Sequence, residues 1–292
     1  MSTGDAAGLA VVDKPAGITS HDVVSRVRRL AGTRKVGHAG TLDPMATGVL
    51  LLGVNRATRL LGHLTLTEKA YDGVVRLGVA TTTDDAEGEE LSRTPAGALT
   101  EERIRSAAAA FVGDIEQVPS AVSAIKVDGR RAYKRVRGGE QVDLPARSVT
   151  VHQLRVGRIR RDGDVVDVPI SVRCSSGTYI RALARDLGQA LGVGGHLVAL
   201  RRTAVGPFTL SEARTLDDLA GEFEMLPMSE VARRCFPTHT LGDAEATAVR
   251  HGRPLQADLG AAGPVAVLDP AGELLALYRQ AGPEARAVAV FV

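Results

Sequence analysis

A glycine-rich segment at residues 36–48, with the sequence VGHAGTLDPMATG, most constrains how this chain can fold. Its three glycines allow left-handed or sharply turned backbone. Pro44 fixes its own φ and disfavours helical geometry at the preceding residue, Asp43. The segment therefore predicts a fixed, turn-rich loop that carries one carboxylate. Asp43 has two interpretations at this point: a functional carboxylate, or an Asx-type turn in which its side chain bonds its own backbone.

Four further short motifs accompany this loop along the chain. In chain order, the five motifs are DKPAGITSH at 13–21, GHAGTLDPMATG at 37–48, EKAY at 68–71, CSSGTYIR at 174–181 and LRR at 200–202. Together they resemble the TruB family of tRNA pseudouridine synthases, strongly over residues 9–215 and weakly in the tail. The match in the loop is nearly continuous over about twelve positions, which is specific for a short motif.

The charge of the chain is unevenly distributed, although its 292 residues carry a net charge of only +2. Residues 126–161 contain eleven basic and three acidic residues, which leaves +8. Residues 212–292 contain seven basic and twelve acidic residues, which leaves −5. The basic stretch indicates a polyanionic partner. The length of the chain suits one large domain and a small one.

Cysteines and apolar runs limit the class of protein further. Cys174 and Cys235 are the only cysteines and form no Cys-x-x-Cys pair, so no zinc site is indicated and a reducing compartment is the simpler interpretation. Residues 1–8 lack the basic and apolar regions of a signal peptide. No apolar run approaches the roughly 20 residues of a membrane span. We therefore expect a cytoplasmic protein without a membrane segment.

Periodicity and turn signals predict mixed strands and helices. Ser20 is the expected N-cap of one helix, Thr100 caps another, and Gly192 ends a third. An Asp-Gly turn at 162–163 indicates a hairpin, and the acidic residues at 84–90 indicate an exposed turn. Helices are expected at 20–30, 55–64, 100–111 and 179–191, and strands at 9–12, 48–54, 71–79, 149–159, 165–174, 265–268, 274–278 and 287–292.

This mixture of elements favours the α+β class. The resemblance implies a pseudouridine synthase fold, with a mixed, largely antiparallel sheet and a small β-rich C-terminal PUA-like domain. We expect a flexible N-terminus at residues 1–8, a catalytic domain at 9–225 and a PUA-like RNA-binding domain at 230–292. An aperiodic, basic segment near residues 120–147 would be a thumb-like RNA-binding insertion in the catalytic domain.

The resemblance assigns three catalytic residues. Asp43 matches the catalytic aspartate, and attack on C6, attack on C1′ and abstraction of the 2′ proton all remain open as its role. Arg181 matches the active-site arginine, whose charge would keep a nearby carboxylate ionised; the alternative is a surface partner on its own helix. Tyr71 matches the active-site tyrosine, which would stack on a flipped uracil; the alternative is a core tyrosine.

Other residues are expected to bind substrate or RNA. His38 would contact the RNA; alternatively, it bonds backbone carbonyls. Lys14 would support the site, and Lys69 would pair with an acid or a phosphate. Leu200 would pack near the target base or in the core. Six basic residues of the thumb-like insertion would contact phosphates, the alternative for each being a solvated surface charge. They are Lys126, Arg130, Arg131, Lys134, Arg135 and Arg137.

The resemblance implies isomerisation of uridine 55 to pseudouridine in the T-loop of tRNAs, on a base flipped out of its loop. The reaction has no redox step, so we expect no cofactor and no metal. The expected protein is a stand-alone monomer that binds the T-arm without a guide RNA or protein partner. Two alternatives stay open: a tRNA-binding folding chaperone, and a guide-RNA-dependent synthase subunit. A metal-dependent hydrolase is disfavoured, because His38 and Asp43 have no third ligand at a recognisable spacing.

Overall fold

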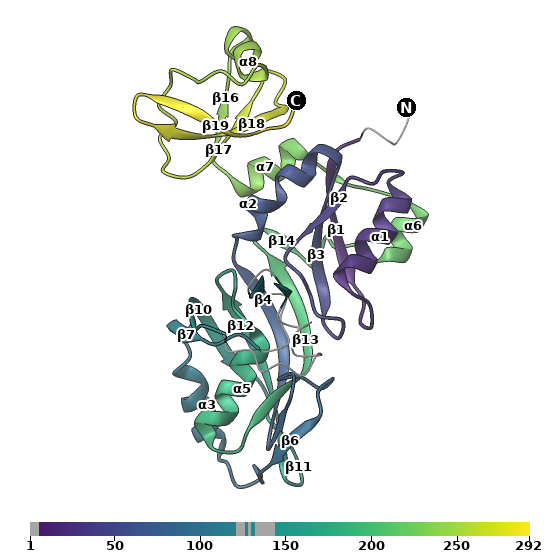
Figure 1. Ribbon diagram of the computed structural model, residues 1–292, viewed down its shortest axis with the longest axis vertical. Helices are drawn as coiled ribbons and strands as arrows, with labels where there is room; N and C mark the ends of the chain where they lie inside the picture. The colour runs from purple at the N-terminus through teal and green to yellow at the C-terminus, as the bar shows by residue number, and fades with distance from the viewer. Residues whose placement is uncertain (1–5, 121–125, 128–129, 132–143) are drawn as a thin grey trace. The chain divides into compact units, whose positions relative to one another are not determined.

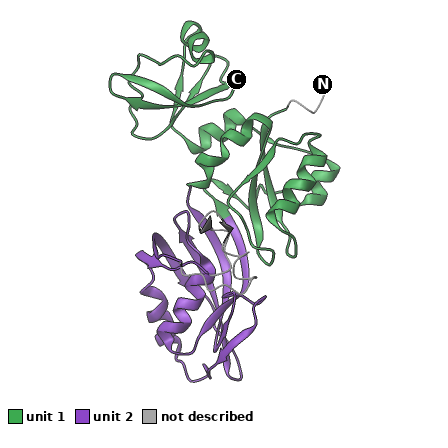
Figure 2. Cartoon of the chain, viewed as in Figure 1, with its two compact units in different colours: residues 1–66, 204–292 green, residues 67–203 purple. Residues whose placement is uncertain are grey.

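Figure 1 shows the computed structural model of the protein, which describes residues 6–120, 126–127, 130–131 and 144–292. The chain divides into two compact units (Figure 2). Unit 1 consists of residues 1–66 and 204–292, and unit 2 consists of residues 67–203. Strands and helices are mixed in both, and most described strand pairs are antiparallel. The predicted α+β class is confirmed, whereas the predicted domain limits stay predictions.

One part of unit 1 is a small sheet with helices on both sides. Its elements are β1 (Gly8–Lys14), α1 (Ser20–Leu30), β2 (Val36–Ala39), β3 (Thr47–Val54), the 3-10 helix η2 (Asn55–Arg59), α2 (Leu61–Thr65), β14 (Phe208–Thr209), α6 (Leu216–Gly221) and β15 (Leu226–Pro227). β3 pairs antiparallel with both β1 and β2, and β15 pairs with β1. Ala10 and Val12 of β1 pack with α1 and α6, whereas Leu9 and Val11 pack with α2 on the other side. This alternation is the period of two that a doubly covered strand requires.

Helix α1 has its cap one residue earlier than the sequence indicated. The Thr19 hydroxyl accepts a hydrogen bond from the Asp22 N–H at 3.1 Å, and the Asp22 carboxylate accepts one from the Thr19 N–H at 2.8 Å. This reciprocal capping box satisfies two N–H groups that the helix itself cannot. The prediction of Ser20 as N-cap is wrong, because the Ser20 hydroxyl bonds Leu42 instead, 22 residues further along the chain.

The end of the chain forms a second sheet within unit 1. Its strands lie in the order β16-β17-β18-β19, with a parallel first pair and antiparallel pairs after it. Three of these strands were predicted; α7 and α8 were not. Arg234 of α7 lies 4.4 Å from the centre of the Phe208 ring and makes two hydrogen bonds to Glu212, which ties α7 to the strand β14. The elements are α7 (Met228–Cys235), β16 (Thr238–Thr240), α8 (Asp243–Arg250), β17 (Val265–Leu268), β18 (Leu274–Ala281) and β19 (Glu284–Val290).

Unit 2 is built on a sheet with the strand order β13-β4-β12-β10-β7. The predicted hairpin turn is confirmed, since β11 and β12 pair antiparallel around Gly163. No strand is predicted from the sequence at the position of β13, where only the LRR motif is identified. The elements are β4 (Lys69–Leu77), β5 (Val79–Thr81), β6 (Glu90–Arg93), α3 (Glu101–Ala109), β7 (Gly113–Gln117), β8 (Lys126–Val127), β9 (Arg130–Arg131), β10 (Arg147–Val156), β11 (Arg160–Asp162), β12 (Val165–Cys174), α5 (Ile180–Leu191) and β13 (Gly195–Val205), whose last two residues belong to unit 1.

Helix α5 lies directly against the chain that leads into β13. A Cβ atom added to Gly188 would lie 2.2 Å from the backbone of both Gly194 and Gly195. The helix ends as predicted at Gly192, which adopts a left-handed conformation with φ of 77°. The close approach at Gly188 therefore fixes the distance between α5 and the first residues of β13.

We expect Gly188→Ala to lower the free energy of unfolding by about 3 kcal/mol or more, because backbone must move to admit the methyl group. Gly62→Ala, in helix α2, is the matched control. Nothing lies within 4 Å of a Cβ added there, so the variant should be about 0.5 kcal/mol more stable than wild type. Urea denaturation of both variants measures the difference. Equal stabilities would contradict this account of the packing.

Candidate active site

Asp43 lies in the loop between β2 and β3 of unit 1. Its side chain is half-buried, and its carbonyl accepts a hydrogen bond from the N–H of Ala46 at 3.1 Å, which closes a tight turn. Gly40 and Gly48 bound the loop with φ values of 81° and 101°, a region that other residues rarely adopt. The predicted turn-rich loop is therefore present, and its glycines are required by its geometry.

The side chain of Lys14 holds this loop from inside the protein. Lys14 is 0% exposed, and its ammonium group donates to the carbonyl of Pro15 at 2.9 Å, to that of Pro44 at 3.2 Å and to that of Ala46 at 2.6 Å. These three carbonyls replace the water that a buried ammonium group loses. Two of them, at Pro44 and Ala46, follow Asp43 in the loop. Lys14 was predicted to support the site and to bind RNA; with no exposed surface, it can influence RNA only through the loop.

Two further contacts fix the same loop. The Ser20 hydroxyl accepts from the N–H of Leu42 at 2.9 Å and donates to the carbonyl of Leu42 at 3.1 Å. The N–H of Gly17 donates to the carbonyl of Pro44 at 2.9 Å. The motif at 13–21 therefore supports the loop at 37–48, although the sequence alone did not indicate which of its atoms do so.

His38 lies on β2, two residues before the loop begins at Gly40. It is half-buried and lies opposite Leu52 of β3 in the register of the sheet. It belongs to the same unit as Asp43, which lies in the loop that follows β2. Contact of His38 with RNA stays a prediction.

Unit 2 holds a second group of predicted residues. Lys69, Tyr71 and Gly73 share one face of β4, because alternate residues of a strand point the same way. Leu200 of β13 approaches this face: its Cδ1 atom lies 3.6 Å from where a Cβ on Gly73 would be. Leu200 and Lys69 are buried, whereas Tyr71 is half-buried. The structure therefore brings Tyr71, Lys69 and Leu200 to the same part of unit 2.

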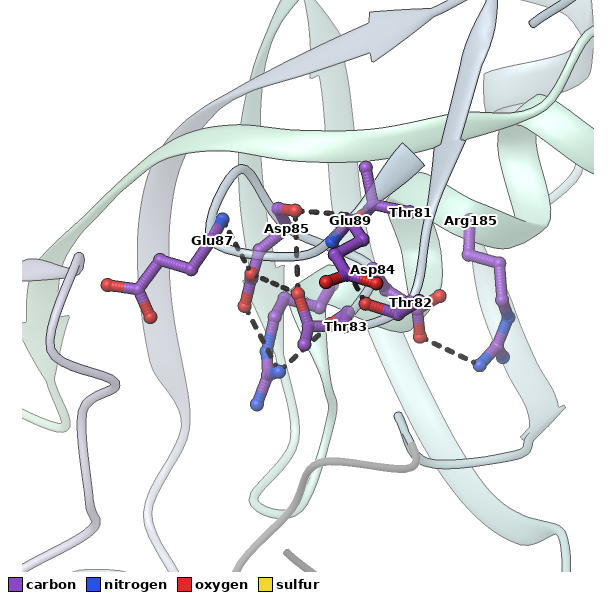
Figure 3. A network of polar contacts seen from close by, with 9 residues as sticks. Thr81, Thr82, Thr83, Asp84, Asp85, Glu87, Glu89 and Arg185 are labelled. Atoms are coloured by element: carbon purple, nitrogen blue, oxygen red, sulfur yellow. Dashed lines mark hydrogen bonds and ion pairs between the residues drawn. The ribbon is translucent and has the colours of Figure 1, made fainter. Parts of the chain in front are cut away.

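Arg181, in the first turn of α5, is 5% exposed and forms an ion pair with Asp85. Its Nη1 atom lies 3.1 Å from Asp85 Oδ2 and donates to the carbonyl of Thr83 at 3.0 Å. Asp85 is 3% exposed and also accepts from the Thr83 hydroxyl and from the N–H of Glu87. Figure 3 shows this turn, with Asp85 among its polar contacts. The alternative of Arg181 as a surface partner is wrong, as is the expectation that the whole of 84–90 is exposed.

Burial changes the proton affinity of Lys69. The side chain donates to the carbonyl of Thr67 at 2.6 Å. Burial, followed by the nearby charge of Arg202, lowers the pKa of Lys69 from 10.5 to about 8. Burial also raises the pKa of the Cys174 thiol to about 11, so this cysteine is a neutral packing group at neutral pH. Pairing of Lys69 with an acid or a phosphate stays a prediction.

The predicted site residues are divided between the two units. Unit 1 carries Lys14, His38 and Asp43, and unit 2 carries the other catalytic residues, Tyr71 and Arg181. The approach of Arg181 to Asp43 remains a prediction. In the thumb-like insertion, β8 and β9 pair antiparallel, with Lys126 opposite Arg131 and Arg130 next to it in the ladder. The remaining three basic residues lie outside the described part of the chain: Lys134, Arg135 and Arg137.

No group of three or more His, Cys, Asp and Glu side chains among the described residues could hold a metal ion. No helix in the same residues is long and apolar enough to cross a membrane.

Family models match the chain along most of its length. The model of the TruB family pseudouridylate synthase N-terminal domain matches residues 28–180. The model of the tRNA pseudouridylate synthase B C-terminal domain matches residues 181–234, and that of the tRNA pseudouridine synthase II C-terminal region matches residues 236–292. The chain belongs to the TruB family of pseudouridylate synthases.

Individual relatives are similar over nearly their whole length. A protein of Arthrobacter sp. (strain FB24) named tRNA pseudouridine synthase B is 59% identical, over 97% of this chain and 96% of its own. A protein of the same name from Thermobifida fusca (strain YX) is 57% identical, over 97% of this chain and 98% of its own.

Solved structures agree with the fold. The crystal structure of a Cbf5-Nop10-Gar1 complex contains a chain that matches with a TM-score of 0.76 and 28% identity, over 100% of this chain and 86% of that one. A chain in the structure of an H/ACA RNP bound to a substrate RNA containing 2′-deoxyuridine matches with a TM-score of 0.74 and 27% identity, over 98% of this chain and 85% of that one. The expected pseudouridine synthase fold with a C-terminal β domain is confirmed.

We expect Lys14→Met to lower the free energy of unfolding by about 2–4 kcal/mol, because the carbonyls of Pro15, Pro44 and Ala46 lose their buried donor. Lys35→Met, at an exposed position before β2, is the matched control and should change stability by less than about 0.5 kcal/mol. Chemical denaturation at pH 7 compares the two. A Lys14 variant as stable as the Lys35 variant would show that these three bonds do not hold the loop.

The lowered pKa of Lys69 makes stability depend on pH. Between pH 8 and 10.5 the unfolded chain retains the Lys69 proton and the folded protein has lost it, so the contribution of this group to stability rises with pH. We expect wild type to gain about 2–3 kcal/mol relative to Lys69→Met between pH 7 and pH 10. Denaturation at each pH measures the gap, and the gap to Lys35→Met should stay flat. A flat gap for Lys69→Met would refute the shift.

Proposed function

We propose that this protein isomerises uridine 55 to pseudouridine in the T-loop of tRNAs, as a stand-alone cytoplasmic monomer. One observation carries the proposal: relatives that are 59% and 57% identical over nearly full length bear the name tRNA pseudouridine synthase B. The loop with Asp43 adds a chemical reason, because the buried Lys14 ammonium group donates to the backbone of this loop and so holds a half-buried carboxylate in place.

The chemistry asks for few groups. The bond from N1 of uracil to C1′ breaks, the base turns over, and C5 joins C1′ with loss of the C5 proton. A carboxylate is suited to act as nucleophile or base in such a reaction, and Asp43 takes that role. Arg181 would keep it ionised, and Tyr71 would offer a ring face to the flipped base. Because no electron is transferred in any step, the proposed reaction uses no redox cofactor.

The proposed substrate is the T-arm of tRNA. Flipping a uridine out of its stack costs a few kcal/mol, and this cost is smallest in a strained loop. The basic residues of the insertion would contact phosphates around that loop, which predicts an affinity that falls with added salt.

A guide-RNA-dependent subunit is the competing function, because the similar solved chains come from structures titled as H/ACA RNP and Cbf5-Nop10-Gar1 complexes. Those chains are 27% and 28% identical to this one, about half the identity of the relatives named tRNA pseudouridine synthase B. The larger similarity favours the unguided enzyme.

The test is release of tritium from a T-arm hairpin labelled at C5 of uridine, with EDTA present and no other RNA or protein. We expect wild type to release tritium and Asp43→Asn to be slower by about a thousandfold or more, as when other enzymes lose an essential group. Asp164→Asn, at an exposed turn of unit 2, should keep the rate of wild type. Filter binding of the same hairpin should give similar affinities for all three proteins.

Several outcomes would count against the proposal. Release that requires a guide RNA or an added protein would favour the guided subunit. Tight binding without release by any of the proteins would favour a folding chaperone. Release from a hairpin with the position-55 uridine replaced by cytidine and another uridine labelled would contradict the proposed target.

A further inference from the structure

Gln117, at the end of β7, is 1% exposed and uses both ends of its carboxamide on one residue. Its Oε1 atom accepts from the N–H of Tyr179 at 2.7 Å, and its Nε2 atom donates to the carbonyl of Tyr179 at 3.1 Å. A carboxamide carries the same donor and acceptor as a peptide group, so it pairs with Tyr179 as a neighbouring strand would. This contact joins two segments that are 62 residues apart in sequence.

Tyr179 is the residue on which helix α5 begins. It takes the N-cap position with extended backbone, and its own side chain makes no capping hydrogen bond to the helix. Its carbonyl also accepts from the N–H of Leu183, the first bond of the helix. Gln117 therefore sets the position of the first turn of α5, which is the turn that carries Arg181.

Arg185 makes a second connection one helical turn later. Its Nη2 atom donates to the carbonyl of Val118, the residue after Gln117, at 2.7 Å. Its Nη1 atom lies 3.2 Å from Asp84 Oδ2, a contact drawn in Figure 3, and its Nε atom donates to Asp186 at 2.8 Å. The fixed planar fork of the guanidinium thus contacts one backbone carbonyl and two carboxylates at once, a geometry that the compact ammonium group of a lysine does not reproduce.

The two arginines of α5 pair with different carboxylates of the turn at residues 81–89. Residues four apart share one face of a helix, so Arg181 and Arg185 both reach the same turn. Arg181 takes Asp85 and Arg185 takes Asp84. Asp84 has a φ of 59°, a left-handed conformation that aspartate tolerates better than most residues. In that conformation, the adjacent carboxylates of Asp84 and Asp85 face two arginines that are one helical turn apart. Each guanidinium group therefore pairs with its own carboxylate.

We propose that Gln117 and Arg185 are positioning residues, which together hold the first turn of α5 so that the Arg181 guanidinium keeps one place and orientation. The inference rests on the proposed function, in which Arg181 acts beside the reacting base. Along the helix, the contact of Gln117 lies before Arg181 and that of Arg185 lies after it. Both contacts involve consecutive residues, Gln117 at the end of β7 and Val118 directly after it. Their loss leaves the Arg181–Asp85 pair free to shift along with the helix.

The experiment measures the single-turnover rate of tritium release at saturating enzyme, the dissociation constant for the T-arm hairpin, and the melting temperature. Gln117→Ala and Arg185→Lys are the two test variants. Each should slow release by about tenfold to a hundredfold, as small misplacements of catalytic groups do, and change the dissociation constant by less than about twofold. Gln189→Ala is the matched control, because this glutamine lies exposed on the same helix. It should match wild type in all three measurements.

A double-mutant cycle separates positioning from general destabilisation. If Gln117 acts through Arg181, adding Gln117→Ala to Arg181→Lys should slow release by less than about twofold, because the group it positions is already altered. A loss of stability alone would multiply the two effects, and the rate would then follow the fraction of folded protein.

The outcomes are distinct. A tenfold or larger loss that vanishes in the Arg181→Lys background supports the inference. Rates equal to wild type for both test variants, or fully multiplicative effects in the cycle, overturn it. If Gln117→Ala does not fold, Arg185→Lys decides by the same two criteria. A wild type that releases no tritium overturns the proposed function itself, and this inference falls with it.

Discussion

One buried positive charge organises the loop on which the proposed chemistry depends. The ammonium group of Lys14, at the end of β1, donates to the carbonyls of Pro44 and Ala46, which follow Asp43 in the loop, and to the carbonyl of Pro15. A buried ammonium is tolerated only where acceptors surround it, so the loop must adopt the conformation that presents those carbonyls. The glycines at both ends of the loop make that conformation accessible. The loop that carries Asp43 is thereby held through its backbone carbonyls.

Unit 2 fixes its charged group by a different principle. Arg181 is placed by its ion pair with Asp85 and by its hydrogen bond to the carbonyl of Thr83. Two arginines on one helical face would compete for one carboxylate, and the turn at 81–89 avoids this by offering two. In both units, then, backbone and buried polar contacts hold a charged side chain more rigidly than a solvated surface could.

Local patterns in the sequence predicted local structure well. Gly192 as a helix terminator, Gly163 in a hairpin turn and Thr100 as a cap all depend on a few neighbouring residues, and the structure has each of them. Long-range contacts left no such pattern. The sequence favours Ser20 over Thr19 as the helix cap, because it does not distinguish a serine hydroxyl that bonds its own helix from one that bonds a loop 22 residues away. Asp85 appeared to belong to a solvated acidic turn, since its partner Arg181 is 96 positions later. The strand β13 mixes arginines with apolar residues, so its burial depends on neighbours that the sequence does not specify.

The similarity to chains from an H/ACA RNP and from a Cbf5-Nop10-Gar1 complex shows how little the fold alone decides. One fold can serve a protein that works within an assembly and a protein that works alone, so function has to be argued from the site. Under the proposed function, an unguided enzyme must read the RNA with its own side chains, and phosphate contacts supply affinity without sequence information. The selection of one uridine must then come from the shape of the loop and from the cost of flipping its base. A rigidly held Asp43 and Arg181 suit that task, because a site that does not adjust to its substrate accepts only the RNA that already fits it.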